Sequence, residues 1–178
     1  MESSQIKDIL YEEIRQITDA KIQAAISAGN KAKIVQEILQ NCFKKISEIE
    51  DSPANFVACA EGLTHYVLTN TLIPSQRKIE VDGVDIDIVI PDSKILAESP
   101  AESLVLYFVK TDGDKAIEHL AKLQKIQPKK DNIWIISKSV VQTQFRTYDV
   151  TTDFSAIFDD IDEFFAKSSK IRFRIFKS

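Results

Sequence analysis

The feature that most constrains the fold is an apolar run at residues 104–109, LVLYFV. A strand buried on both faces has no side turned to water, so it reads as a nearly continuous apolar run. A turn sequence follows, then a helix expected over 115–126 and a short apolar strand at 133–136. A strand, a helix and a strand in this order are typical of a right-handed parallel crossover. The segment therefore predicts two buried parallel strands joined by a helix.

A helix and a hairpin are expected before this crossover. Ser52 is a suitable N-cap and Pro53 suits the first helical position, which predicts a helix that ends before Pro74. Residues 78–81 and 84–90 then alternate between apolar and polar, and the Asp-Gly pair between them is typical of a hairpin turn. The order predicted from 52 to 137 is helix, three strands, helix, strand, and we expect residues 93–101 to form a loop.

The N-terminal residues 1–50 predict a separate helical hairpin. Apolar side chains recur at three- and four-residue spacing over 4–27 and again over 31–49, and Gly29 and Asn30 interrupt the pattern. Neither helix can bury its apolar stripe alone, so each must pack on the other, on the core or on a second copy of the chain. A protein partner or a homodimer formed through these helices is therefore one expectation.

The remaining residues, 52–178, predict one α/β domain of the α+β type, with its core at 52–138. After the core, residues 144–150 suggest a strand, and Asp153 is a suitable N-cap for a helix that runs to residue 167. Residues 171–176 alternate and predict a terminal strand, so we expect a C-terminal helix-strand extension.

Composition narrows the class of protein. The chain has 178 residues, 44% of them apolar and 28% charged, which suits a soluble domain with a real core. The formal charge of -4 excludes a uniformly basic nucleic-acid coat, although a local basic face remains open. We find no signal peptide and no apolar run of membrane-spanning length, so we expect no membrane partner and a cytoplasmic location. Cys42 and Cys59 are expected to be buried free thiols, and the two histidines lack a zinc-site pattern.

Two acidic residues in the predicted hairpin are candidates for a functional site. Asp85 and Asp87 lie on one face of an otherwise apolar strand, and their mutual repulsion must be relieved by a cation or by solvent. Lys110 shares a face with Phe108 on the next strand, so Asp87 and Lys110 meet near one end of the sheet if the two strands are adjacent. The alternative is an ordinary hairpin with a solvent-facing acidic side and a strand-end lysine whose head lies in water.

This stretch resembles the core of the restriction-endonuclease-like superfamily, the PD-(D/E)xK nucleases, which has the same order of elements. GVDIDIVIPD places Asp87 at the position of the family's aspartate, and YFVKT supplies its lysine, Lys110. Glu61, in AEGLTHYV, matches the glutamate that many members carry in the first helix. Phe108 stands where the second carboxylate of the motif is expected. The two helices before the core and the tail after it lie outside the resemblance.

The resemblance implies a magnesium-dependent chemistry. In working members the carboxylates hold Mg²⁺, the metal activates water and stabilises the pentacovalent phosphate, and the lysine assists. It thus implies catalytic roles for Glu61, Asp87 and Lys110, and Asp85, Asp87 and Glu61 as metal ligands. Since Phe108 cannot bind a metal, a working site needs a relocated carboxylate, for which Glu80 and Glu102 are the nearby candidates.

Two groups of basic residues suggest contacts with nucleic acid. One is the cluster at the end of the helix over 115–126 and in the loop after it: Lys122, Lys125, Lys129 and Lys130. Basic side chains at a helix C-terminus are also favourable without a ligand. The other group is Arg172 and Arg174, which share a predicted strand face with Phe176, an arrangement that suits single-stranded nucleic acid. The alternative is an edge strand whose charges prevent aggregation.

The leading hypothesis from the sequence is a nuclease-fold protein that binds or processes nucleic acid and whose catalytic site is degenerate. A non-enzymatic interaction or dimerisation module is one alternative. An active magnesium-dependent nuclease with a relocated carboxylate is the other. Fold analogy alone does not choose between an enzyme and a binding protein.

Overall fold

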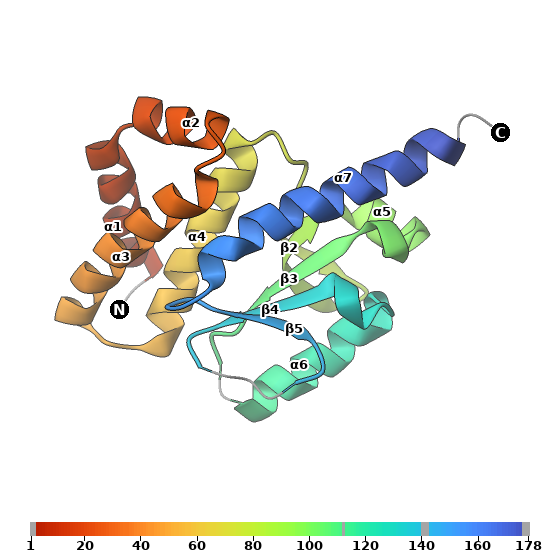
Figure 1. Cartoon of the computed structure of the whole chain (residues 1–178). Coiled ribbons are helices and arrows are strands. Elements are labelled where there is room, and N and C mark those ends of the chain that lie inside the picture. The colour runs from red at the N-terminus through yellow and green to blue at the C-terminus, as the bar shows by residue number, and fades with distance from the viewer. Residues whose placement is uncertain (1–2, 112, 140–142, 176–178) are drawn as a thin grey trace.

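A five-stranded mixed sheet forms the centre of the computed structural model, which describes residues 3–111, 113–139 and 143–175 (Figure 1). The strands are β1 (Gln76–Val81), β2 (Val84–Ile90), β3 (Leu104–Phe108), β4 (Ile133–Ser137) and β5 (Arg146–Asp149). They lie in the order β1-β2-β3-β4-β5. The pairs β1-β2 and β2-β3 are antiparallel, whereas the pairs β3-β4 and β4-β5 are parallel. The expected α+β class is confirmed.

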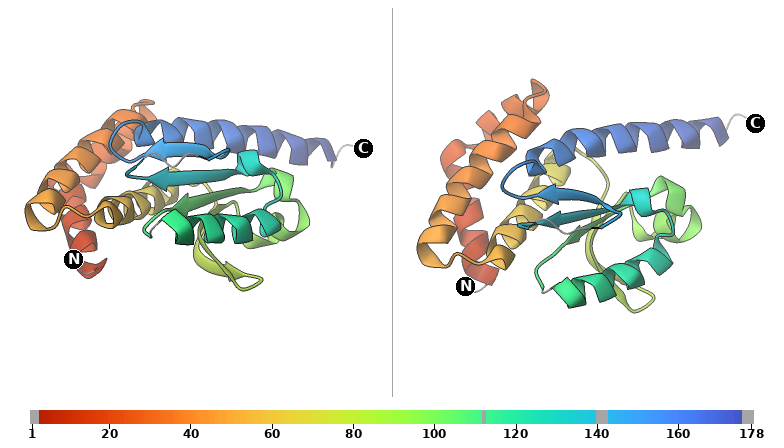
Figure 2. Two further views of the ribbon diagram at one scale, coloured as in Figure 1. Left: turned by 90° about the horizontal axis from the view of Figure 1, so that it is seen from below. Right: turned by 60° about the horizontal axis from the view of Figure 1, so that its bottom comes forward.

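Helices cover both faces of the sheet (Figure 2). One face packs on α4 (Pro53–Asn70) and α7 (Ile157–Ile175), and the other packs on α5 (Ser93–Glu98) and α6 (Gly113–Ile126). Strand β3 shows why the apolar run is continuous. Its residues Leu104, Leu106 and Phe108 join the core with α4 and α7, whereas Val105 and Tyr107 join the core with α6. The predicted strand buried on both faces and the parallel β3-α6-β4 crossover are both confirmed.

The N-terminal helices pack on the same core as the sheet. They are α1 (Ser3–Ile17), α2 (Asp19–Ser27) and α3 (Lys31–Ile49), and α1 and α3 contact each other and α4. The apolar stripe of α1, which includes Ile6 and Leu10, belongs to one buried cluster with residues of α4 and β3. The sequence left open what covers the apolar stripe of α1, and the structure shows that it packs on the core of the same chain. Cys42 and Cys59 lie in this cluster as buried free thiols, as expected.

The single helix predicted over 4–27 is wrong, because it is broken at Thr18. Thr18 has a φ of 75° and its hydroxyl accepts a hydrogen bond from the backbone N–H of Lys21, so it caps the start of α2. The apolar spacing continues across the break, and for that reason the periodicity did not reveal it. Gly29, with a φ of +76°, ends α2 at the predicted position.

The loop predicted over 93–101 is also wrong. The segment forms α5 and a 3₁₀ turn, η1 (Pro100–Glu102). The carboxylate of Asp92 accepts a hydrogen bond from the backbone N–H of Ile95 at 2.8 Å, which is an N-cap. The Pro-Asp pair that ends β2 therefore starts a helix at the same point.

The predicted terminal strand is wrong as well. The chain after β5 passes through η3 (Phe154–Ala156) into α7, and residues 171–175 continue that helix, while Phe176 lies outside the described residues. Positions 172 and 174 share a face in a strand but not in a helix. The segment whose predicted strand suggested a nucleic-acid contact for Arg172 and Arg174 is therefore helical. Among the described helices, none combines the length and the apolar character needed to cross a membrane.

Candidate functional site

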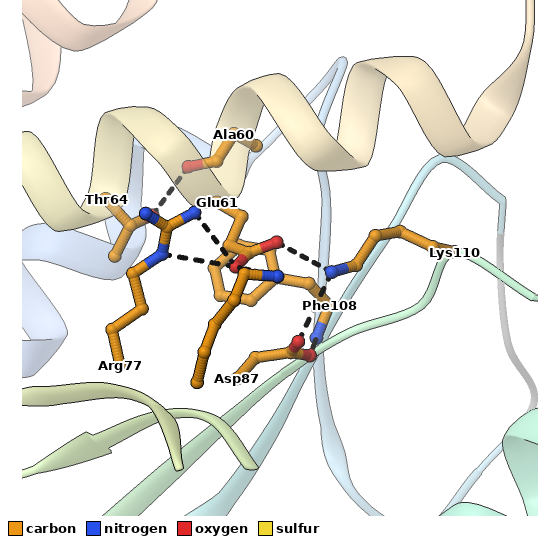
Figure 3. A network of polar contacts seen from close by, with 8 residues as sticks. Ala60, Glu61, Thr64, Arg77, Asp87, Phe108 and Lys110 are labelled. Carbon is orange, nitrogen blue, oxygen red and sulfur yellow. Dashed lines mark hydrogen bonds and ion pairs between the residues drawn. The ribbon is translucent and has the colours of Figure 1, made fainter. Parts of the chain in front are cut away.

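Three residues that the sequence singled out converge at one end of the sheet (Figure 3). Glu61 comes from α4, Asp87 from β2, and Lys110 from the chain just after β3. The ammonium Nζ of Lys110 lies 2.6 Å from Glu61 Oε2 and 3.2 Å from Asp87 Oδ1. The predicted meeting of Asp87 and Lys110 is found, and Lys110 bridges the two carboxylates.

The end of the β2-β3 ladder positions Asp87. The last paired residues toward this end are Ile88 and Leu106, and beyond them the backbone N–H of Phe108 donates to Asp87 Oδ2 at 2.8 Å. The carboxylate thus takes the place of a backbone acceptor where the strands separate. A buried backbone N–H needs such a partner, so Asp87 stabilises the strand end as well as pairing with Lys110.

Glu61 lies deeper than Asp87, and its side chain is only 3% exposed. Besides Lys110 it accepts from the guanidinium of Arg77, whose Nε and Nη2 both lie 3.3 Å from Oε1, and from Lys78 Nζ at 3.1 Å. One buried carboxylate therefore holds three cations. Burying a carboxylate is costly unless it is paired and hydrogen-bonded, and this arrangement meets that condition.

The two neighbouring cations on β1 reach one carboxylate because the strand is irregular there. Adjacent side chains of a regular strand point to opposite faces. Lys78 has a φ of 49°, in the left-handed region, while its neighbours Arg77 and Ile79 pair with β2. Such a backbone conformation costs a lysine about 1 kcal/mol or more. The three-cation environment of Glu61 is thus built partly on a strained residue.

Glu61, Asp87, Arg77, Lys78 and Lys110 form a charged cluster, and its opposite charges stabilise one another. Burial raises the pKa of Glu61, but the hydrogen bond and charge of Lys110 and the charge of Lys78 outweigh this, so its pKa lies below the ordinary value of 4.5. Burial likewise lowers the pKa of Lys110, and the charges of Asp87 and Glu61 outweigh it and raise that pKa above 10.5. Glu61 and Lys110 are therefore both charged at neutral pH.

Phe108 is a core residue and supplies nothing to the site except its backbone N–H. The residue is 1% exposed, and its side chain packs in the hydrophobic cluster that contains residues of α4 and α7. Neither candidate for a relocated carboxylate replaces it. Glu102 precedes β3, at the opposite end of that strand from Lys110, and Glu80 is exposed on β1 opposite Asp85. Asp85 is itself exposed, two residues along β2 from Asp87.

The donor set does not suit Mg²⁺ as it is arranged. Both oxygens of Glu61 and both oxygens of Asp87 already accept from protein donors, and Lys110 occupies the position between them. Mg²⁺ requires near-octahedral oxygen coordination and commonly uses carboxylates together with water. Across the described part of the chain, no three side chains of histidine, cysteine, aspartate or glutamate are grouped as metal ligands would be.

Two pockets flank Lys110. The first, of about 320 Å³, lies between the sheet and α6, and Asp85, Asp87 and Lys122 line it. Within it the ring of His119 packs on the ring of Tyr107, with centroids 4.7 Å apart. The second pocket, of about 250 Å³, lies on the other side, between α1, α4 and β1, and Glu61 lines it.

The basic residues predicted to bind nucleic acid are separated. Lys122 lines the first pocket and pairs with Glu118 at 2.7 Å. Helix α6 runs back along the parallel crossover, so Lys125, Lys129 and Lys130 lie toward the end of the sheet where β3 and β4 begin, away from Lys110. The C-terminal part of α7, which carries positions 172 and 174, extends past the sheet at that same end (Figures 1 and 2).

Arg77 and Lys78 are the site residues that the sequence interpretation missed. Lys78 stands opposite Asp87 in the hairpin, because its neighbours Arg77 and Ile79 pair with Ile88 and Ile86. Counting back from the Asp-Gly turn would have placed this basic pair beside the aspartate. The left-handed backbone conformation of Lys78 could not be predicted from the sequence pattern.

The sequence and the structure were compared with protein families, with curated proteins and with solved structures, and none of the three comparisons gave a match.

Proposed function

We propose that this chain is a nucleic-acid-binding protein built on a restriction-endonuclease-like core whose carboxylate site no longer cleaves. The observation that carries the proposal is the position of Lys110, which bridges Glu61 and Asp87 while Phe108 is buried in the core. Support also comes from the order of elements. Helix α4, strands β1 to β3, helix α6 and strand β4 follow one another as the resemblance implies, with α5 added before β3.

The charge of the cluster opposes metal binding and favours anions. Glu61 and Asp87 carry one negative charge each, whereas Arg77, Lys78 and Lys110 carry one positive charge each, so the cluster has a formal charge of +1. A divalent cation entering it meets three cations at close range and must displace Lys110. A phosphate group meets a net attraction, which is the main sequence-independent term in nucleic-acid binding.

The proposal predicts binding that depends strongly on salt. Labelled single- and double-stranded DNA and RNA of the same sequence are titrated with the protein at several salt concentrations, and binding is followed by fluorescence anisotropy. We expect affinity for at least one form to fall steeply as salt rises, because phosphate contacts release counterions. The double variant Arg77→Ala, Lys78→Ala should lower both the affinity and the slope of log affinity against log salt.

A matched control is the variant Lys44→Ala, which removes an exposed lysine of α3 that lines neither pocket beside Lys110. Its affinity and slope should stay close to those of the unmodified chain. The absence of binding to all four nucleic acids at low salt would overturn the proposal. So would equal losses of affinity in the control and in the double variant.

A further inference from the structure

The two pockets beside Lys110 differ in charge. The first pocket is lined by Lys110, Lys115 and Lys122 but also by Asp85, Asp87 and Glu118, so its charges balance. The described lining of the second pocket carries four cations, Lys7, Arg77, Lys78 and Lys110, against the single carboxylate of Glu61. Of the two described linings, only that of the second pocket has a large excess of positive charge. A pocket of one sign concentrates ligands of the opposite sign.

Lys7 is the cation in this pocket that is not committed to Glu61. It is exposed on α1, and the described part of the chain offers it no ion pair, whereas the other three cations share the buried carboxylate. Helix α1 lies outside the core that resembles nucleases. The N-terminal helices therefore contribute to the pocket directly instead of serving only as packing.

Close packing of two helices holds α1 against the pocket. Gly62 of α4 lies under Leu10 of α1, and a Cβ built on Gly62 would lie 2.9 Å from Leu10 Cδ2, too close for an unaltered contact. Leu10 is buried in the main core, as is Ile6 one turn earlier. Both side chains line the pocket together with Ala58 of α4. Packing against α4 thus positions the part of α1 that carries Lys7. The pocket surface between the charged side chains is apolar.

We propose that the second pocket binds the terminal phosphate of a nucleic-acid strand, an inference that rests on the proposed function. A phosphate monoester carries a charge of about −1.5 to −2 at neutral pH and has three acceptor oxygens, so it suits four cations better than a singly charged internal diester. A volume of about 250 Å³ is small for a ligand site and accommodates an end group better than a duplex. The apolar side chains of Ile6, Leu10 and Ala58 can cover the adjoining sugar.

The test compares strand ends. Three labelled single-stranded oligonucleotides of one sequence carry a 5′-phosphate, a 3′-phosphate or hydroxyl groups at both ends, and their affinities are measured at fixed salt by anisotropy. We expect one phosphorylated form to bind about tenfold tighter than the hydroxyl form, as losing hydrogen bonds to a charged group would predict. Added inorganic phosphate should compete for the pocket and so reduce the difference in affinity between the phosphorylated and hydroxyl forms. Lys7→Ala should remove most of this difference, whereas Lys115→Ala, in the other pocket, should leave it intact.

Each outcome separates this inference from the function on which it rests. Equal affinity for all three oligonucleotides overturns the inference and leaves the binding function standing. A loss in Lys7→Ala that is the same for phosphorylated and hydroxyl forms also overturns it. If no oligonucleotide binds but inorganic phosphate raises the melting temperature of the unmodified chain and not of Lys7→Ala, the pocket is a phosphate site and the nucleic-acid function fails. If phosphate has no effect either, both fail.

Discussion

Lys110 Nζ lies 2.6 Å from Glu61 Oε2 and 3.2 Å from Asp87 Oδ1, so one ammonium group joins helix α4 to strand β2. The side chain of Lys110 is 27% exposed, whereas that of Glu61 is 3% exposed. An ion pair of this kind loses less to solvent screening than a surface pair, and removing one partner leaves the other buried and unbalanced. The cluster is therefore part of the stability of the fold as well as a candidate site.

Removing the ammonium group should destabilise the chain. Lys110→Met leaves two carboxylates facing each other, although Glu61 keeps Arg77 and Lys78 as partners. Breaking a buried pair costs about 3–5 kcal/mol, and the remaining partners reduce this, so we expect a loss of about 2 kcal/mol in the free energy of unfolding. Urea denaturation at neutral pH measures it. The control Lys115→Met, at an exposed position, should change stability by no more than about 0.5 kcal/mol. Equal effects of the two variants would contradict the role given to Lys110.

Neutralising Glu61 should make stability less dependent on pH. The pKa of Glu61 in the folded chain lies below 4.5, so its ionised form stabilises the fold above that pH, and this contribution is lost as pH falls through the folded pKa. Glu61→Gln should be less stable than the unmodified chain by about 2 kcal/mol at pH 7. The difference should shrink at about pH 3. Urea denaturation at both pH values measures it, and a difference that stays constant would mean that the charge of Glu61 is not what stabilises the fold.

Phe108 should behave as a core residue. It is among the largest fully buried side chains, and Phe108→Ala leaves a cavity between the sheet and its helices. Such a truncation costs about 3–5 kcal/mol. Thermal and urea denaturation measure the loss, with Phe145→Ala, a partly buried position, as the milder comparison. A cost below about 1 kcal/mol would show that position 108 is free to carry another side chain, such as the missing carboxylate.

The lysines at the far end of the sheet should contribute little to binding. Lys129 and Lys130 are exposed before β4, at the end away from Lys110. The double variant Lys129→Ala, Lys130→Ala should keep the affinity for nucleic acid within about twofold, because its charges lie outside both pockets beside Lys110. Anisotropy titrations at two salt concentrations test this. A tenfold loss would instead place the binding surface at the lysine cluster predicted from the sequence, Lys122, Lys125, Lys129 and Lys130.

The sequence predicted those parts of the fold in which local pattern and burial agree. The run at 104–109 has no polar face, and β3 has none turned to water. Asp87 and Lys110 could be placed together because adjacent strands bring equivalent ends into contact. Position 108 could be recognised as apolar but not as part of the core beneath α4, since that depends on packing between distant segments.

Other parts could not be predicted because the same pattern fits two structures. The alternation over 171–175 suits a strand by its period, yet these residues extend a helix that has already begun at Ile157. The break at Thr18 requires a backbone conformation that apolar spacing does not record. The position of Lys7 at the second pocket depends on how closely α1 approaches α4, where Gly62 lies against Leu10.

The most direct test of the account combines binding and cleavage in one experiment. Labelled DNA and RNA in single- and double-stranded forms are incubated with the chain in Mg²⁺, in Mn²⁺ and in chelator, and bound complexes and products are measured for the unmodified chain and for Asp87→Asn. The account predicts salt-dependent binding and no metal-dependent products from either protein. Cleavage that requires Mg²⁺ or Mn²⁺ and disappears in Asp87→Asn would contradict it and show that the site is a working nuclease.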